Sequence, residues 1–379
     1  MTDLFLFGTL CHQPLLRVVL DRAAEPKAAQ ASGYQVRLVA GRTYPMLVAG
    51  DGVAQGLLLA GANDRDLARL AFYEAGYRLA EQGVAVLVDG TLRTARYFAP
   101  EPGSADPGAA WDLGHWQSTR GDMAVLAVGE YMSAFGTATA ASIAGRYPMM
   151  LVRAASHLRG QSDPAPTTLR HAQTPGDVVV DRLTQPYAHF FAVEEYDLRH
   201  RRFDGAMSGR LNRAAFVSGD AAVVMPYDPW LDRVMVVEQF RPGPFARGDR
   251  QSWQLEPIAG RIDPGETPEQ AARREAVEEA GITLGDLLKV GNFYPSPGAK
   301  TEYLYSFVGI ADLSDSRPRL AGLAAEGEDI RAHVLSFDAL MALVASGEVA
   351  TAPLLMTAYW LEHRRAALRA AAGNRPPAP

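Results

Sequence analysis

An acidic helix between residues 260 and 282 constrains this chain more than any other feature of its sequence. Thr267 and Pro268 are typical of a helix start, because a threonine hydroxyl can accept a hydrogen bond from an unpaired backbone N–H and proline is tolerated in the first turn. Gly281 is typical of a helix end, because glycine readily adopts the left-handed conformation that terminates helices. The spacing therefore predicts a helix over residues 268–280.

Three glutamates lie on this predicted helix at positions that bring their carboxylates together. Glu275 precedes Glu278 by three residues and Glu279 by four, so all three lie near one helical face. Like charges in this arrangement repel one another and destabilise an isolated helix. Carboxylate oxygens suit Mg²⁺ or Mn²⁺, and such a cation would offset the repulsion. A solvated acidic helix face is the alternative interpretation.

The flanking residues resemble the signature of the Nudix hydrolases. Gly260 is followed after five residues by Glu266, and after seven more by the run Arg-Glu-Ala-Val-Glu-Glu-Ala-Gly-Ile that ends at Ile282. The resemblance implies hydrolysis of a nucleoside diphosphate linked to another group, with a water activated by metal ions. It gives Arg274 and Glu266 a structural role. We call the segment Gly260–Ile282 the Nudix box. The metal ligands that the resemblance implies in or beside it are Ala259 (through its backbone carbonyl), Glu275, Glu278 and Glu279, with Glu275 and Glu279 also assigned to catalysis.

Segments outside the box resemble the bacterial ADP-ribose pyrophosphatases over roughly residues 185–370. They are Tyr196–Ser208, Asp220–Pro229, Val237–Arg241, Ser296–Gly298 and Gly322–Ile330. The resemblance implies Mg²⁺-dependent hydrolysis of ADP-ribose to AMP and ribose 5-phosphate, with Mn²⁺ as an alternative metal. It also implies a homodimer formed through the Nudix domain, in which both chains shape each site.

Further residue roles follow from the same resemblance. The substrate-binding residues that it implies are Phe190, Arg213, Arg241 and Glu302. Phe190 corresponds to the ring that stacks on adenine, and its neighbour Phe191 is an alternative. Glu326 corresponds to the general base, although Glu302 stays open for that role, and Glu328 corresponds to a further metal ligand. Each of these side chains also has a plainer interpretation as a core, surface or loop residue.

Two other functions remain open for this half of the chain. The substrate could be a different nucleoside diphosphate sugar or a related dinucleotide. The domain could instead be a non-catalytic ADP-ribose sensor whose output is the N-terminal domain. The complete set of box carboxylates favours catalysis, because a pure sensor has no need of them.

The N-terminal half resembles the gamma-glutamylcyclotransferase-like fold in two short motifs. These are Phe7-Gly8-Thr9-Leu10 and the later segment Phe72–Arg78. The resemblance implies that Gly8, Thr9 and Leu10 form a substrate-binding loop and that Glu74 acts as acid and base on gamma-glutamyl compounds. Phe7 replaces a common tyrosine and Ala75 a common glycine, so a retained fold without activity is equally open. Cys11 is interpreted as a buried structural residue.

The expected fold class is α+β, with a small N-terminal β-barrel or α+β domain and a C-terminal α/β/α sandwich built on a mixed sheet. Pro164, Pro166 and Pro175 mark a linker between the two. The expected domains are 1–158, comprising the cyclotransferase-like domain with a helical tail, then a linker at 159–178, the Nudix domain at 179–372 and a disordered tail at 373–379.

Local patterns also predict individual elements. Helices are expected from Leu113 to Leu158, a loop at Pro100–Ala110 and a strand at His189–Val193.

Composition limits the partners of the chain. Its 379 residues carry a net charge of −6, which argues against a broad nucleic-acid or membrane surface. No apolar run approaches the roughly 20 residues that span a bilayer. A single cysteine allows no intrachain disulfide, and together with the lack of a recognisable signal peptide this leads us to expect a cytoplasmic protein.

Overall fold

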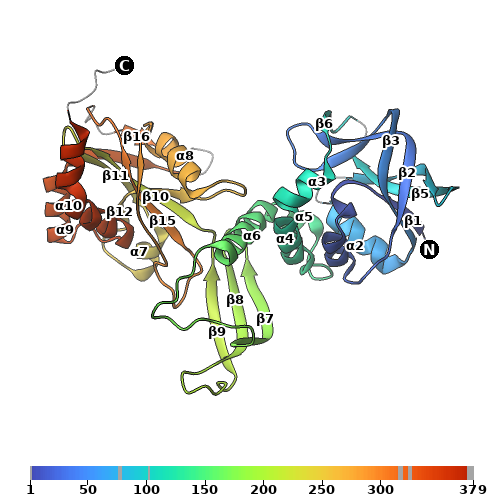
Figure 1. Cartoon of the computed structure of the whole chain (residues 1–379), viewed down its shortest axis with the longest axis horizontal. Helices are drawn as coiled ribbons and strands as arrows, with labels where there is room; N and C mark the ends of the chain where they lie inside the picture. The colour runs from blue at the N-terminus through green and yellow to red at the C-terminus, as the bar shows by residue number, and fades with distance from the viewer. Residues whose placement is uncertain (1, 76–78, 101–102, 315–318, 323–326, 374–379) are drawn as a thin grey trace. The chain divides into compact units, whose positions relative to one another are not determined.

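The computed structural model describes residues 2–75, 79–100, 103–314, 319–322 and 327–373 (Figure 1). The chain divides into two compact units, Met1–Asp163 and Pro164–Pro379. The predicted tail at 373–379 lies outside the described residues except for Gly373. No described helix has the combination of length and apolar composition that crossing a membrane requires.

Unit 1 is built on a β-barrel. Its strands are β1 (Thr2–Leu6), β2 (Lys27–Val39), β3 (Pro45–Ala62), β4 (Leu79–Val88), β5 (Thr91–Pro100) and β6 (Pro107–Ala110). They follow the order β3-β1-β5-β4-β2-β6, and β3 also pairs with β2, which closes the sheet on itself. Closure satisfies strand edges that would otherwise present unpaired backbone groups. Strand β6 lies within the segment predicted as a loop, so that part of the prediction is wrong: pairing with β2 decides its conformation.

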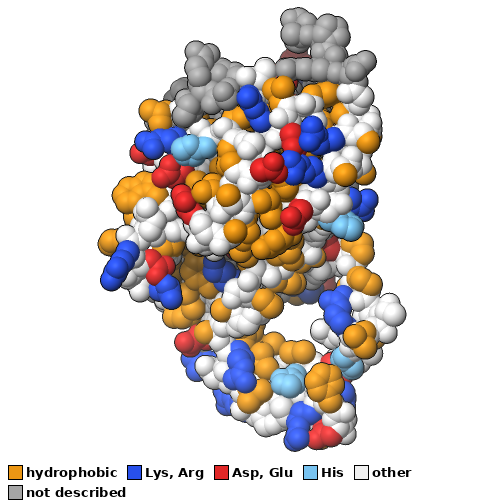
Figure 2. All heavy atoms as spheres, turned by 90° about the vertical axis from the view of Figure 1, so that its left-hand side faces the viewer, with side chains coloured by type: hydrophobic (Ala, Val, Ile, Leu, Met, Phe, Trp, Pro, Cys, Tyr) orange, Lys and Arg blue, Asp and Glu red, His pale blue; other side chains and the backbone are white. Residues whose placement is uncertain are grey.

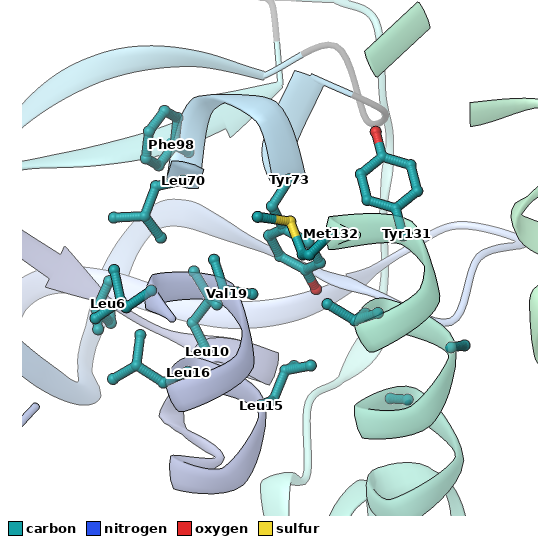
Figure 3. Close-up of a cluster of buried hydrophobic side chains, with 14 of the residues drawn as sticks. Leu6, Leu10, Leu15, Leu16, Val19, Leu70, Tyr73, Phe98, Tyr131 and Met132 are labelled. Carbon is teal, nitrogen blue, oxygen red and sulfur yellow. The ribbon is translucent and has the colours of Figure 1, made fainter. Parts of the chain in front are cut away.

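Helices pack against the barrel of unit 1. They are η1 (Gly8–Cys11), α1 (Gln13–Leu20), α2 (Asp64–Ala75), α3 (Leu113–Trp116), the π-helical turn η2 (Gln117–Gly121), α4 (Asp122–Met132), α5 (Ala140–Ala144) and α6 (Tyr147–Ser162). Figure 3 shows how Leu10, Leu16 and Tyr73 from three of these segments meet in one buried cluster with Met132 of α4. The cluster anchors both motifs of the N-terminal half, since η1 and α2 each contribute to it.

Unit 2 contains an eight-stranded mixed sheet between two helical layers. Its strands are β10 (Ala221–Asp228), β11 (Arg233–Phe240), β12 (Trp253–Glu256), β13 (Ile258–Arg261), β14 (Leu287–Phe293), β15 (Leu304–Ile310), β16 (Arg319–Ala321) and β17 (Ile330–Ser336), and its helices are α7 (Pro242–Arg247), α8 (Pro268–Ala280), α9 (Phe337–Ser346) and α10 (Ala352–Ala372). The main path runs β14-β15-β10-β11-β17-β16, with β12 on β11 and β13 on β10.

Side-chain alternation along β10 assigns the helices to opposite faces of this sheet. Val224 packs in the cluster that contains Ala272 of α8, whereas Met225 packs in the cluster that contains Leu340 of α9 and Leu354 of α10. Successive strand residues point to opposite faces, so the sheet is covered on both sides. This is the α/β/α sandwich that the resemblance implied.

A separate three-stranded antiparallel sheet precedes the sandwich. It consists of β7 (Val178–Ala188), β8 (Ala192–His200) and β9 (Leu211–Val217). The strand predicted at His189–Val193 is wrong for His189–Phe191, which form the turn between β7 and β8, where the His189 amide donates to the Phe191 carbonyl over 2.8 Å. Ala192 and Val193 begin β8, as predicted. On the face of the molecule in Figure 2, basic and acidic side chains are interspersed among hydrophobic ones.

Candidate functional sites

Helix α8 begins and ends where the sequence predicts. The Thr267 hydroxyl accepts from the Gln270 amide, and the Gln270 side chain accepts from the Thr267 amide, which makes a complete capping box. Gly281 ends the helix in the left-handed conformation, with φ of 64°. Both signals are local, which explains why the sequence alone located them.

Arg274 organises the carboxylates of the box. Its guanidinium donates to both oxygens of Glu266, at 3.0 and 2.9 Å, and to the Arg261 carbonyl at 2.9 Å. The structural role expected of Arg274 and Glu266 is therefore confirmed. Nη1 of the same side chain reaches Glu275 at 2.6 Å and Glu278 at 2.9 Å. One cation thus joins the loop before α8 to two of the three clustered glutamates.

Glu275 lies against a backbone that leaves no room for another side chain. A Cβ atom added to Gly260 would come within 1.8 Å of the Glu275 carboxylate. Glycine at this position therefore lets strand β13 approach α8 closely. On the adjoining residue, the Ala259 amide donates to Glu279 over 3.2 Å.

Burial raises the pKa of both carboxylates that face β13. The pKa of Glu279 rises to about 8, mainly through desolvation, with the Ala259 hydrogen bond opposing the shift and the charges of Glu275 and Glu328 adding to it. The pKa of Glu275 rises to about 6, again mainly through burial, and the nearby Arg274 opposes the rise. Both groups resist ionisation when no cation is present.

Arg241 extends the site to a glutamate that the sequence analysis missed. Its Nε donates to Glu256 over 2.6 Å, and its charge also acts on Glu279. Burial raises the pKa of Glu256, Arg241 opposes the rise, and the charge of Glu302 adds to it. Arg241 therefore lies within electrostatic reach of Glu256 and Glu279, and Glu256 lies within reach of Glu302. The sequence signal that could have identified Glu256 was a glutamate among apolar residues two positions before Ile258.

The structure describes part of the segment Gly322–Ile330 that carries Glu326 and Glu328. Glu328 is half-buried, and its charge contributes to the pKa of both Glu275 and Glu279, so it lies near the box. Glu326, the expected general base, lies outside the described residues. Among the residues that the structure describes, no group of three or more His, Cys, Asp or Glu side chains has the arrangement of a formed metal site.

Phe190 is joined to the box through Arg261. The Arg261 guanidinium lies over the Phe190 ring at 4.2 Å from its centroid, and the Arg261 carbonyl is the one that Arg274 binds. The Phe190 side chain is 50% exposed. Phe191 packs on both Phe190 and Phe216, each at 4.7 Å between centroids. Phe190 is thus the more accessible of the two rings.

Arg213 lies apart from this group. It is an exposed residue of β9, and its guanidinium donates to the Asn212 carbonyl over 2.8 Å. Within the described ranges, no hydrogen bond or ion pair connects it to a residue of the box.

The N-terminal motifs meet at a cavity of about 40 Å³ in unit 1. Thr9, Leu10, Tyr73 and Glu74 line it, and the Thr9 and Tyr73 hydroxyls are 3.5 Å apart. Burial raises the pKa of Glu74 to about 8. Gly8 adopts φ of 65°, and a Cβ there would lie 2.1 Å from the nearest Pro45 side-chain atom.

Cys11 is the last residue of η1 and has a structural role. Its thiol donates to the Leu6 carbonyl at 3.4 Å, and burial raises its pKa to about 12. A thiol with so high a pKa is a poor nucleophile.

Comparison with known proteins assigns both halves. Residues 218–356 match the NUDIX domain family, and residues 4–118 match the family described as gamma-glutamyl cyclotransferase, AIG2-like. The ADP-ribose pyrophosphatase of Escherichia coli (strain K12) is 38% identical over 193 residues, which cover 51% of this chain and 91% of that protein. The chain belongs to the Nudix family.

Other Nudix relatives differ in the substrate that their names state. The ADP-ribose pyrophosphatase of Haemophilus influenzae (strain ATCC 51907 / DSM 11121 / KW20 / Rd) is 34% identical over 185 residues, or 48% of this chain and 85% of that protein. A GDP-mannose pyrophosphatase of Escherichia coli (strain SMS-3-5 / SECEC) is 32% identical over 167 residues, or 44% of this chain and 84% of that protein. The chain is therefore related to the Nudix pyrophosphatases. Because the names of these relatives state different substrates, the comparison does not assign a substrate to this chain.

Proposed function

We propose that unit 2 hydrolyses the pyrophosphate of ADP-ribose, giving AMP and ribose 5-phosphate. The observation that carries the proposal is the exposed Phe190 ring, which Arg261 connects directly to the box. An aromatic face at the entrance to a carboxylate site suits a nucleotide whose base can stack while its phosphates reach the acidic helix. The names of the relatives that are 34–38% identical support the same substrate.

The donor set fits a divalent cation. Glu275 and Glu279 are held close to β13 with raised pKa values, which is the condition that a bound cation reverses. We expect Glu275, Glu278, Glu279, Glu328 and the Ala259 carbonyl to hold Mg²⁺, or Mn²⁺ in its place. When bound, the metal neutralises pyrophosphate charge and lowers the pKa of water. Arg274 holds two of these carboxylates in position, and Arg241 offers positive charge beside Glu279.

A carboxylate must also accept the proton of the attacking water. We assign this role to Glu326 and keep Glu302 as the alternative. Separate replacement of each by glutamine tests the assignment. Near-normal turnover in Glu326→Gln together with lost turnover in Glu302→Gln would reverse it.

The deciding experiment identifies the products formed from ADP-ribose and Mg²⁺, with and without a chelator. AMP and ribose 5-phosphate that disappear with chelator support the proposal. Faster hydrolysis of GDP-mannose than of ADP-ribose would assign the site to another nucleoside diphosphate sugar, as the name of one relative suggests. Tight binding of ADP-ribose without turnover would instead make the domain a sensor.

We further infer a homodimer formed through unit 2. Strand β7 exposes four large side chains, each between 44% and 53% accessible: Val178, Val180, Leu183 and Tyr187. A surface of this kind favours burial against another copy. Dimerisation would also give Arg213 a site to act on in the second chain. Mixing Arg213→Ala with Glu279→Gln tests this, because shared sites should restore about one quarter of wild-type activity in re-formed dimers, whereas independent sites restore none.

A second function is favoured by the N-terminal cavity. We propose that unit 1 releases 5-oxoproline from gamma-glutamyl compounds, with Glu74 moving the proton. The supporting observation is that Glu74 lines the same cavity as Thr9 and Leu10, with a pKa of about 8 that suits proton transfer near neutral pH. Release of 5-oxoproline that is lost in Glu74→Gln is the expected result. No release from any gamma-glutamyl substrate would leave unit 1 as a retained fold without activity.

A further inference from the structure

A second, wider cavity of about 680 Å³ adjoins the Glu74 cavity in unit 1. Thr9, Tyr44 and Tyr73 line both cavities, so the two share a wall. Glu74 lines the narrow one. A substrate with its reacting group beside Glu74 would have to pass Thr9 and Tyr73 to reach the wider space.

The far wall of the wide cavity comes from helices α3 to α6. Trp116 and Met123 are each 7% exposed and present large apolar surfaces, and Tyr147 and Leu151 of α6 add to them. The cyclotransferase family match ends at residue 118, so most of this wall lies beyond the part of the chain that the family describes. The helical segment thus supplies an apolar wall that the family match does not account for.

Two guanidinium groups line this cavity, those of Arg42, which is exposed, and Arg120. Arg120 is half-buried within the π-helical turn η2, a type of turn that often occurs at functional sites. It forms no ion pair with any carboxylate that the structure describes. A carboxylate on a bound ligand would satisfy it.

We propose that the wide cavity binds the amine portion of a gamma-glutamyl dipeptide and selects a large apolar second residue. The side chain of that residue packs against Trp116 and Met123, and its carboxylate binds Arg120. This inference rests on the proposed activity of unit 1 and adds its substrate class.

The reaction balances without another reactant. The α-nitrogen of the gamma-glutamyl group attacks its own side-chain carbonyl carbon, and a C–N bond forms that closes the five-membered ring. The amide bond to the second residue breaks in the same overall exchange. Glu74 takes the proton from the attacking nitrogen and returns it to the departing amine. The products are 5-oxoproline and the free apolar amino acid, which leaves through the wide cavity.

The experiment measures 5-oxoproline released by the full-length protein from three compounds: gamma-glutamylphenylalanine, gamma-glutamylglycine and gamma-glutamylphenethylamine. Burial of the phenyl ring should favour the phenylalanine dipeptide over the glycine dipeptide in kcat/KM by roughly 10- to 100-fold. A ratio near one would overturn the inference while leaving the activity of unit 1 in place. No product from any of the three would overturn both.

Two replacements on helix α5 provide a matched pair. Ala144 lines the wide cavity, whereas Ala141 of the same five-residue helix is exposed. Ala144→Phe should fill part of the cavity and reduce the preference for the phenylalanine dipeptide about tenfold, and Ala141→Phe should retain it. Equal loss of the preference in both variants would contradict the assignment.

Arg120→Gln tests the charged contact with a change that leaves the apolar wall intact. It should lower kcat/KM for gamma-glutamylphenylalanine about tenfold, because a charge-assisted hydrogen bond is lost. Gamma-glutamylphenethylamine has no carboxylate and serves as the internal reference. An equal decrease for both compounds would show that Arg120 does not read the carboxylate.

Discussion

Burial raises the pKa of both Glu279 in unit 2 and Glu74 in unit 1 to about 8, but the charges around the two carboxylates differ. For Glu279, desolvation is the main cause; the charges of Glu275 and Glu328 add to the rise in its pKa, and the Ala259 amide and Arg241 oppose it. For Glu74, burial accounts for the shift. A carboxylate surrounded by like charges suits a site that recruits a cation, whereas an isolated one in an apolar pocket suits proton transfer.

The largest expected effect separates these two sites directly. Glu279→Gln should reduce ADP-ribose hydrolysis roughly 10³-fold, because it removes a proposed metal ligand, and should leave 5-oxoproline release unchanged. Rates of both reactions on the same protein sample measure this. Glu269→Gln, in the exposed first turn of α8, is the control and should keep full activity. A loss of both activities in Glu279→Gln would mean that the units are coupled.

A smaller effect tests the close approach of β13 to α8. Gly260→Ala should place a methyl group against Glu275, lowering hydrolysis about 100-fold and stability by about 1–3 kcal/mol. Steady-state kinetics and thermal unfolding measure the two effects. Gly291→Ala is the matched control, since its Cβ has no neighbour within 4 Å. Normal kinetics in Gly260→Ala would argue against a requirement for Glu275 in its observed position.

The adenine contact should have a still smaller effect. Phe190→Ala should raise KM for ADP-ribose about tenfold, because stacking contributes on the order of 1–3 kcal/mol. The same variant should affect a uridine-linked analogue less. Phe203, which is fully exposed, provides the control replacement Phe203→Ala. An unchanged KM in Phe190→Ala would transfer the stacking role to Phe191 or remove it.

The pH dependence of stability should show the smallest effect and isolates unit 1. Because the pKa of Glu74 is raised from 4.5 to about 8 on folding, the folded state holds this proton more tightly than the unfolded state. The contribution of Glu74 to the free energy of unfolding should therefore be most favourable below about pH 4.5. It should decrease as the pH rises from 4.5 to about 8. Glu74→Gln should remove this dependence and raise Tm at pH 8 by about 4 °C or more. Parallel pH profiles of Tm for the two proteins would contradict the assigned burial.

Part of the fold was accessible from sequence because its signals are local. Thr267, Pro268 and Gly281 define both ends of α8, and the spacing of three glutamates placed them on one face. The Gly-Thr-Leu motif likewise located the turn η1 in unit 1. The strand expected at His189–Val193 was wrong for His189–Phe191. Aromatic residues favour a strand by propensity alone, whereas the pairing of β7 with β8 places the turn at these residues.

Tertiary structure decided the rest. Several contacts join residues that are well separated along the chain. They are the ion pair between Arg241 and Glu256, the stacking of Arg261 on Phe190, and the approach of the Thr9 and Tyr73 hydroxyls. Such contacts depend on strand register and on which helix covers which face, and neither is encoded within a short window of residues. The sequence by itself therefore determined which residue types stand at the two glutamate sites. Packing determined which side chains surround each one, because burial and the distances between charges exist only in the folded chain.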